Sequence, residues 1–194
     1  MLDDARCSAV IAPTRRALGV HHAKLDARLI DFDAPADDAA LWSADAVICA
    51  LGTTIKQAGS RAAFRRIDHG YPLQFAQLAR RHGTPAFVLN SAKGANPDSR
   101  IFYNQIKGEL ERDLIAMGWP SLSLVRPSLI DGERSESRPG EDIGLVFSRL
   151  FNPVLPRGWR SNPATRIAQV MVDAALAATP GLHIVKSDQL IAKP

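Results

Sequence analysis

Short apolar runs alternate along the chain with longer segments of helical periodicity, and this alternation constrains the fold more than any other feature. The run from Ala44 to Leu51 (ADAVICAL) ends at Gly52 and is apolar enough for a parallel strand covered on both faces. The segment from Gly59 to Arg81 repeats apolar residues every three or four positions, which predicts one long helix. Alternating strands and helices predict a parallel sheet with right-handed crossovers, which is an α/β fold.

The remaining elements continue this alternation. Further strands are predicted at Ser8 to Ala12 (ended by Pro13), Arg28 to Phe32, Ala86 to Leu89, Leu122 to Val125 and Leu182 to Val185. Further helices are predicted at 36–43, Ile101 to Met117, Asp142 to Leu150, and from Asn162-Pro163, as N-cap and first helical residue, to about Ala178. The segment from Ser128 to Glu141 is rich in Gly, Ser, Pro and charge, which indicates a loop. Because no linker interrupts the chain, we expect a single domain over residues 1–194.

Composition narrows the class of protein. An apolar share of 46% and a charged share of 23% are typical of a packed globular chain. No run of 18 apolar residues suggests a membrane span. The net charge is +4, but the basic residues are scattered, so no nucleic-acid partner is expected. Cys7 and Cys49 lack metal or redox spacing, and the acidic start MLDDARCSAV is unlike a secretory signal, so we expect a cytoplasmic protein without a metal.

A serine, a tyrosine and a lysine stand where proton-transfer chemistry is expected. Ser91 follows the strand from Phe87 to Asn90, and open α/β sheets bind ligands at the carboxyl ends of their strands. Tyr103 and Lys107 are four apart on the next predicted helix and therefore share a face. A nearby ammonium lowers the pKa of a phenol, which suits Tyr103 to acid–base work, while Ser91 can hydrogen-bond a substrate oxygen. The alternative is a half-buried tyrosine beside a solvated lysine.

The string NSAKGANPDSRIFYNQIKGELE, with SLVRPSLIDGER beyond it, resembles the atypical short-chain dehydrogenase/reductases, in particular the Tat-interacting-protein-like NAD(P)-binding branch. The resemblance covers nearly the whole chain. It implies a Rossmann-like doubly wound sheet with helices on both faces. It also implies that Tyr103 and Lys107 are the catalytic pair, that Ser91 is the third member, and that Lys107 holds the nicotinamide ribose.

The resemblance further implies residues that contact NADP, with NAD as the alternative cofactor. Besides Lys107 they are Arg15, Arg16, Asp31, Phe32, Ala50, Leu51 and Gly52. The two arginines would meet the 2′-phosphate, since guanidinium groups bind phosphate with paired hydrogen bonds. The alternative is two exposed charges at a strand end. The Asp-Phe pair would receive the adenine, and the last three residues would lie along the ribose.

One part of the family pattern has no counterpart here. The family begins with a strand, a Gly-x-x-Gly-x-x-Gly turn and a helix, whose backbone N–H groups hold the pyrophosphate. This strand is central in the order 3-2-1-4-5, so its two neighbours are expected to have unpaired edges. Three alternatives stay open: a natural protein that starts upstream of Met1, closure of the two neighbours into one sheet, or a strand lent by another chain, as in a homodimer. We expect the chain as given to bind a dinucleotide weakly or not at all.

The sequence therefore predicts an NAD(P)H-dependent oxidoreductase of the short-chain dehydrogenase/reductase type, acting on a small-molecule carbonyl or alcohol. Substrate contacts are expected from the segments at about 128–160. Two alternatives remain: a non-catalytic NADP-binding regulatory or protein-interaction module, and an inactive truncated product. Loss of turnover with retained cofactor affinity after Tyr103→Phe would identify an enzyme.

Overall fold

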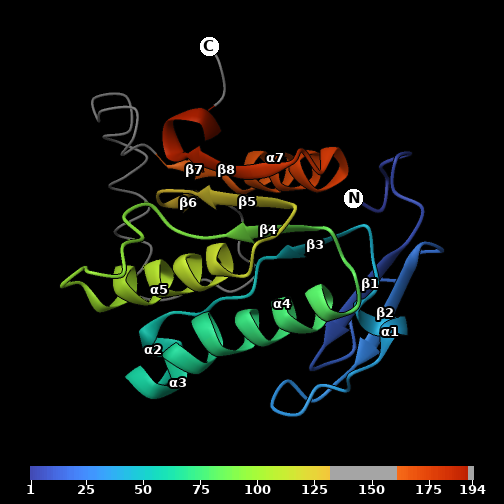
Figure 1. Ribbon diagram of the computed structural model, residues 1–194, viewed down its shortest axis with the longest axis horizontal. Helices are drawn as coiled ribbons and strands as arrows, with labels where there is room; N and C mark the ends of the chain where they lie inside the picture. Colours follow the sequence, from blue (N-terminus) through green and yellow to red (C-terminus); the bar gives the residue numbers. More distant parts are fainter. Residues whose placement is uncertain (132–160, 192–194) are drawn as a thin grey trace.

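The computed structural model describes residues 1–131 and 161–191 and confirms the α/β class (Figure 1). The strands are β1 (Val10–Thr14), β2 (Leu25–Leu29), β3 (Ala46–Cys49), β4 (Ala86–Asn90), β5 (Ser121–Arg126), β6 (Ile130–Asp131), β7 (Asn162–Pro163) and β8 (Gly181–Lys186). The helices are α1 (Ala39–Trp42), α2 (Ile55–Ala58), α3 (Arg61–Arg65), the π-helical turn η1 (Arg66–Gly70), α4 (Tyr71–Arg81), α5 (Phe102–Ala116), α7 (Ala164–Ala177) and the 3₁₀ turn η3 (Ser187–Leu190). The predicted helix from Asp142 to Leu150 and most of the predicted loop lie outside the described residues.

The main sheet has four parallel strands in the order β3-β4-β5-β8. Helices α4 and α5 lie on one side of it and α7 on the other (Figure 1). In β4, Phe87 and Leu89 pack with residues of α4 and α5, whereas Val88 packs with residues of α7. Coverage on both faces explains why this strand is apolar at consecutive positions, and it confirms the expected layering.

The strands β1 and β2 form a separate parallel pair. Strand β1 pairs with β2, and β3 pairs with β4, so within the described residues β1 and β3 do not close into one sheet. Of the three arrangements expected from the sequence, direct closure of these two strands is therefore not the one adopted. Helices α1 and α4 cover this region through an aromatic cluster that includes Phe32, Trp42, Tyr71 and Phe75.

The predicted bounds of the first two strands were wrong by a few residues. Strand β1 continues through Pro13, although this proline was predicted to end it. A proline lacks an N–H donor, but a strand with a free edge tolerates it. Strand β2 begins at Leu25, three residues before the predicted start at Arg28, because the charged Asp26 interrupts the apolar pattern. Asp26 and Arg28 point to the same exposed face and form an ion pair of 2.7 Å, so their charges do not disturb the strand.

The predicted long helix is a helical run that contains a π-helical turn. Gly59, with φ of 80°, ends α2, and Ser60 then caps α3 through its side chain. From Arg61 to Arg81 the chain stays helical, but η1 widens its middle over five residues. A π turn adds one residue to a helical turn, and this changes which side chains beyond the turn face a neighbouring element.

Asn162 has a different role from the predicted N-cap. It is fully buried in the short strand β7, which pairs with β6. Its Oδ1 accepts from the Ser128 N–H at 2.8 Å and from the Ser187 hydroxyl at 2.9 Å, and its Nδ2 donates to the Ser187 carbonyl. The side chain therefore joins the segment after β5 to the turn after β8. Helix α7 begins only at Ala164, and its predicted end near Ala178 is confirmed.

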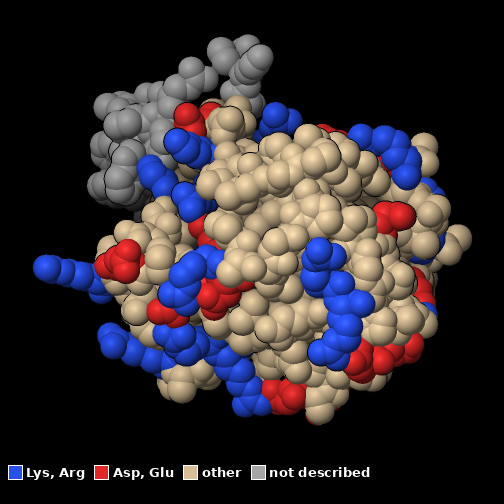
Figure 2. Space-filling model, viewed as in Figure 1, with Lys and Arg blue, Asp and Glu red and all other residues tan. Residues whose placement is uncertain are grey.

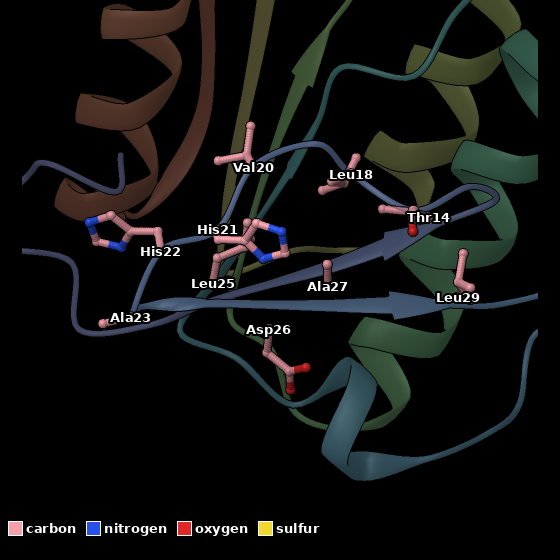
Figure 3. Close-up of a pocket in the computed structure, with 11 residues that line it drawn as sticks. Thr14, Leu18, Val20, His21, His22, Ala23, Leu25, Asp26, Ala27 and Leu29 are labelled. Atoms are coloured by element: carbon pink, nitrogen blue, oxygen red, sulfur yellow. The ribbon is translucent and has the colours of Figure 1, made fainter.

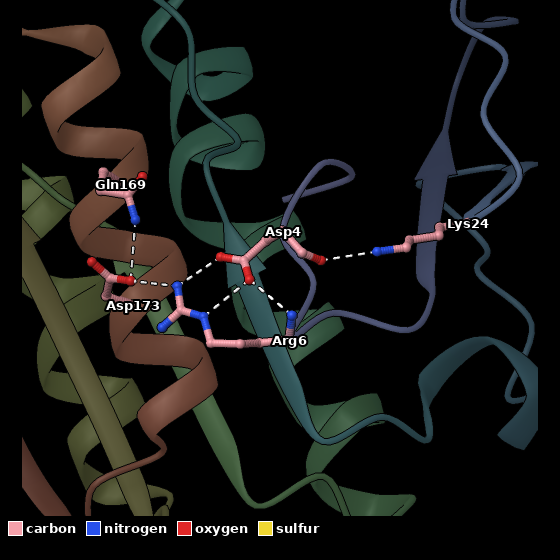
Figure 4. Close-up of polar contacts among 5 residues, drawn as sticks. All are labelled: Asp4, Arg6, Lys24, Gln169 and Asp173. Atoms are coloured by element: carbon pink, nitrogen blue, oxygen red, sulfur yellow. Dashed lines mark hydrogen bonds and ion pairs between the residues drawn. The ribbon is translucent and has the colours of Figure 1, made fainter.

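A polar network ties the N-terminal segment to α7 (Figure 4). The Arg6 guanidinium contacts Asp4 at 2.6 Å and Asp173 at 2.8 Å, and Lys24 donates to the Asp4 carbonyl. Arg6 and Asp173 are about half exposed, so these ion pairs contribute little to stability. None of the described helices is long and apolar enough to cross a membrane.

Acidic side chains lie among the basic ones around α2, α3 and α5 on the face shown in Figure 2. Two pairs illustrate this mixing: Arg65 with Glu109 at 2.6 Å and Arg112 with Asp113 at 2.9 Å. The positive charge on this face is therefore partly neutralised locally.

Candidate functional site

The structure places Tyr103, Lys107 and Glu111 along one side of α5, next to the turn that follows β4. The residues are spaced four apart, so each lies about one helical turn from the next. Lys107 and Glu111 are buried, with 4% and 3% exposure, and Tyr103 is half-buried. Ser91 directly follows β4 and is also buried. The predicted positions on a strand end and a helix are therefore confirmed, whereas their roles stay predictions.

The Lys107 ammonium is held by Asp68, which the sequence pattern alone does not indicate as a site residue. Its Nζ lies 2.9 Å from Oδ1 of Asp68, which is 1% exposed, in an ion pair without hydrogen-bond geometry. The other oxygen of Asp68 accepts from the Thr53 N–H at 2.8 Å. A Cβ added to Gly52 would lie 3.1 Å from this carboxylate and 3.6 Å from the ammonium. The turn after β3 therefore approaches the Lys107–Asp68 pair closely, and glycine permits that approach.

The surroundings of Tyr103 differ from those assumed from the sequence. Its ring packs against Phe64, with 5.8 Å between the ring centroids. Burial raises the pKa of Tyr103; the Lys107 ammonium acts to lower it, and the Asp68 carboxylate acts to raise it. The expected effect of the lysine is present, but it does not dominate. Tyr103 is therefore a neutral phenol at physiological pH.

Ser91 faces Glu111. Its hydroxyl donates to Oε1 of Glu111 at 2.5 Å, and Arg126 Nε donates to the same oxygen at 3.0 Å, while Arg126 Nη2 pairs with the other oxygen. The carboxylate holds the pKa of Arg126 above its usual range. A hydroxyl has one proton, so Ser91 must leave Glu111 before it can donate to a substrate.

The loop between β4 and α5 is pressed against the helix at Gly108. A Cβ at this position would lie 2.2 Å from the Asn96 carbonyl carbon and 2.3 Å from the Pro97 nitrogen. The Asn96 N–H also donates to the Asn104 carbonyl at 3.0 Å. Backbone contact of this kind fixes the loop next to Tyr103 and Lys107.

At the end of β1, Arg15 and Arg16 directly follow Thr14, and both are exposed. The Arg15 guanidinium lies over the Phe32 ring, 5.5 Å from its centroid. Phe32 itself is 7% exposed and packs edge-on against aromatic neighbours, so its ring belongs to the core. Asp31 is exposed, and its carboxylate accepts from the Asp33 N–H at 2.9 Å. The structure thus brings Arg15 next to Phe32, and the predicted roles of both residues in cofactor binding stay predictions.

The residues that follow β3 are those predicted to lie along the cofactor ribose. Ala50 and Gly52 are exposed, and Leu51 is half-buried between two core clusters. Gly52 lies beside Lys107, so at least two of the predicted cofactor residues are close in space.

An open pocket of about 720 Å³ lies over the β1–β2 pair (Figure 3). The segment that carries Leu18, Val20 and His21 crosses above these strands, and Thr14 and Asp26 are also among the lining residues. The pocket does not include Ser91, Tyr103 or Lys107. No group of three His, Cys, Asp or Glu side chains suited to a metal occurs in the described ranges.

Asp68 and Glu111 were missed, although the sequence contained a signal for each. Asp68 stands four residues after Phe64 and three before Tyr71, which is apolar-stripe spacing. Glu111 stands four residues after Lys107. A charged residue at a position that the pattern predicts to be buried needs a partner, and this requirement could have identified Asp68.

Comparison with known proteins identifies relatives of this chain by sequence. No family model matches the chain. "Protein fmp52, mitochondrial" of Aspergillus fumigatus is 33% identical and matches 93% of this chain and 81% of its own length. The Aspergillus niger protein of the same name is 36% identical over 75% of this chain and 67% of its own length. "Protein HTATIP2" of Rattus norvegicus is 38% identical, and the match covers 66% of this chain and 50% of that protein.

Solved structures share the fold. MoeE5 in complex with UDP-glucose and NAD has a TM-score of 0.66 at 13% identity, covering 91% of this chain and 66% of MoeE5. A short chain dehydrogenase family protein from Francisella tularensis has a TM-score of 0.60 at 14% identity, covering 93% of this chain and 87% of the other. The Rossmann-like fold expected from the sequence is confirmed.

The comparison corrects one prediction. We expected a cytoplasmic protein, but several relatives are named as mitochondrial, including those of Aspergillus niger and Aspergillus fumigatus. An acidic N-terminal stretch was therefore too weak a signal for location. On the extent of the Aspergillus fumigatus match, this chain belongs to the family of the fungal Fmp52 proteins, and its Rossmann-like fold is similar to that of a short chain dehydrogenase family protein.

Proposed function

We propose that the chain binds a nicotinamide dinucleotide and reduces a small carbonyl compound, or oxidises the corresponding alcohol, with Tyr103 and Lys107 handling the proton. The observation that carries this proposal is the Lys107 ammonium, which lies beside Gly52 at the carboxyl end of β3, one helical turn from the Tyr103 phenol. The names of solved neighbours support this class of cofactor: MoeE5 was obtained with NAD, and RMD from Pseudomonas aeruginosa with NADPH.

The described residues fit two parts of such a cofactor. Lys107 has three N–H donors and is paired with the Asp68 carboxylate, so N–H donors are available for ribose hydroxyls. Gly52 has no side chain that would keep a ribose away from the ammonium. Arg15 and Arg16 are exposed at the end of β1 and suit a 2′-phosphate.

The proton chemistry follows from the state of Tyr103. A bound reduced nicotinamide would supply hydride to the carbonyl carbon. Because burial keeps Tyr103 protonated, its phenol can donate its proton to the carbonyl oxygen as negative charge develops there. The resulting phenolate is stabilised by the Lys107 ammonium and regains a proton from solvent. Ser91 can assist only if its hydroxyl turns from Glu111 toward the substrate.

The direct test combines binding and turnover. Tryptophan fluorescence would be followed during titration with NADPH and with NADH, and loss of reduced cofactor absorbance would be followed with a panel of aldehydes and ketones. We expect weak, saturable binding and substrate-dependent oxidation. If neither cofactor binds at millimolar concentration, the proposal is wrong.

The adenine end can be tested separately with 2′-AMP, which carries the distinguishing phosphate but no pyrophosphate. We expect 2′-AMP to bind more tightly than 5′-AMP, and Arg15→Ala to weaken 2′-AMP binding about tenfold, because a charge-assisted hydrogen bond at an exposed site is lost. Binding of 5′-AMP should change little. Arg100→Ala removes an exposed arginine elsewhere and serves as the control. Equal affinities for the two nucleotides would favour NAD.

A second candidate is a non-catalytic NADP-binding regulatory or interaction module. The contacts that favour it are the Ser91–Glu111 hydrogen bond and the Lys107–Asp68 pair, because each already occupies a residue of the predicted trio. This module would bind NADPH without oxidising it in the presence of any carbonyl compound, and Tyr103→Phe would change nothing measurable.

A further inference from the structure

We propose that Asp68 is a positioning residue, which fixes the Lys107 ammonium and sets the charge that the Tyr103 phenol experiences. The inference deepens the proposed function and rests on it for its catalytic meaning. The contact between Asp68 and Lys107 is a property of the protein alone, however, and can be tested without cofactor or substrate.

Asp68 joins three parts of the site. Its Oδ1 lies 2.9 Å from Lys107 Nζ on α5, and its Oδ2 accepts from the Thr53 N–H after β3 at 2.8 Å. Both side chains are almost completely buried, at 1% and 4% exposure. A buried ammonium without a partner is costly, so Asp68 restricts where the end of Lys107 can lie. The backbone bond to Thr53 in turn restricts the carboxylate.

The π-helical turn directs Asp68 toward α5. Two ion pairs flank the Asp68–Lys107 contact: Arg65 with Glu109 at 2.6 Å and His69 with Asp113 at 2.8 Å. Positions 65, 68 and 69 therefore all face α5, across the junction where α3 becomes η1. Removing one residue from the turn would rotate the preceding or following segment by about 100° and break this set. Such turns are frequent at functional sites, which agrees with a role in positioning.

The charges that act on Tyr103 come from Lys107 on α5 and Asp68 on η1. Cys49, at the end of β3, is close to both of these groups. Burial raises the pKa of the Cys49 thiol, so it stays neutral. The ammonium and the carboxylate together present no net charge to the phenol, and burial then keeps Tyr103 protonated. Without Asp68, the Tyr103 phenolate would become the anion that pairs with Lys107.

The chain has two tyrosines, so Tyr71→Phe leaves Tyr103 as the single titrating phenol. In this background the ultraviolet absorbance of tyrosinate would be followed as pH rises. We expect Asp68→Asn to lower the pKa of Tyr103, with about a tenfold increase in its ionisation constant. Asp113→Asn removes a carboxylate from the same packed elements but not from Lys107, and it should leave the titration unchanged. An unchanged or raised pKa in folded Asp68→Asn protein would overturn the proposal.

A second comparison covers the case in which Asp68→Asn does not fold. Lys107→Met leaves the carboxylate alone and should raise the pKa of Tyr103, whereas Asp68→Leu combined with Lys107→Met removes both charges and should return it toward the parent value. Replacement of a buried ion pair by apolar residues is often tolerated. If the double variant titrates like Lys107→Met, Asp68 has no influence on Tyr103 and the inference fails. If the tyrosine titrations give the expected results but the unsubstituted protein does not oxidise NADPH, the proposed function is wrong and the positioning role of Asp68 stands.

Discussion

Replacing Tyr103 by phenylalanine is expected to lower kcat for carbonyl reduction by about 10²–10⁴-fold, which is the usual contribution of a positioned proton donor. The phenyl ring preserves the packing against Phe64, so only the hydroxyl is lost. Affinity for NADPH should stay the same, because the residues proposed to hold the cofactor are unchanged. Steady-state kinetics and a fluorescence titration on the same protein would measure both quantities.

Tyr71→Phe is a matched control for this experiment. The Tyr71 hydroxyl donates to Asp33 at 2.6 Å and not to a residue of the Lys107–Asp68 pair. Its loss should leave kcat within about twofold, since no proton of the reaction passes through it. Equal kcat values for Tyr103→Phe and Tyr71→Phe would contradict the assignment of Tyr103.

Gly108→Ala is expected to reduce the free energy of unfolding by about 3 kcal/mol or more. Displacement of the loop between β4 and α5 should also lower kcat for carbonyl reduction. The added Cβ would meet the backbone of Asn96 and Pro97 at 2.2 to 2.5 Å, and backbone cannot rotate away as a side chain can. Either the loop leaves α5 or the helix shifts, and both changes disturb the surroundings of Lys107. Urea denaturation would measure the loss.

Gly70→Ala provides the comparison for this substitution. Gly70 has a helical φ of −59°, and a Cβ there would lie 4.0 Å from the Arg65 carbonyl oxygen, which is an ordinary van der Waals distance. An alanine should therefore stabilise the protein by roughly 0.4–1 kcal/mol through the unfolded chain. Similar unfolding midpoints for the two variants would show that the loop does not depend on Gly108.

The hydrophobic periodicity of the sequence was sufficient to predict the layers of helices and strands, but not the exact bounds and regularity of each element. Strands β3, β4 and β5 and helix α5 were found because their apolar positions match the faces that they bury. The start of strand β2 was misplaced because Asp26 interrupts the apolar pattern, and a hydropathy pattern does not register that Arg28 neutralises this charge. The π-helical turn escaped prediction because a period of 3.6 residues assumes a regular helix.

For the site, the sequence located Ser91, Tyr103 and Lys107 on their elements but not their partners. Each partner comes from a different segment: Glu111 is 20 residues from Ser91, and Asp68 lies on the helical run before β4. Tertiary packing decides such contacts, and local spacing does not determine them. The same limitation explains why the direction of the Tyr103 pKa was wrong, because it depends on burial.

The separation of the β1–β2 pair from the main sheet has a consequence for cooperativity. Backbone hydrogen bonds join β3, β4, β5 and β8 into one ladder, whereas β1 and β2 have their own. Opening of the smaller pair therefore need not break a bond of the larger one, so the two can act as distinct units of local unfolding. Arg15 follows β1, whereas Gly52 and Lys107 belong to the main sheet and its helix. A ligand that touched both units would couple their opening equilibria, and occupancy would stabilise the weaker unit most.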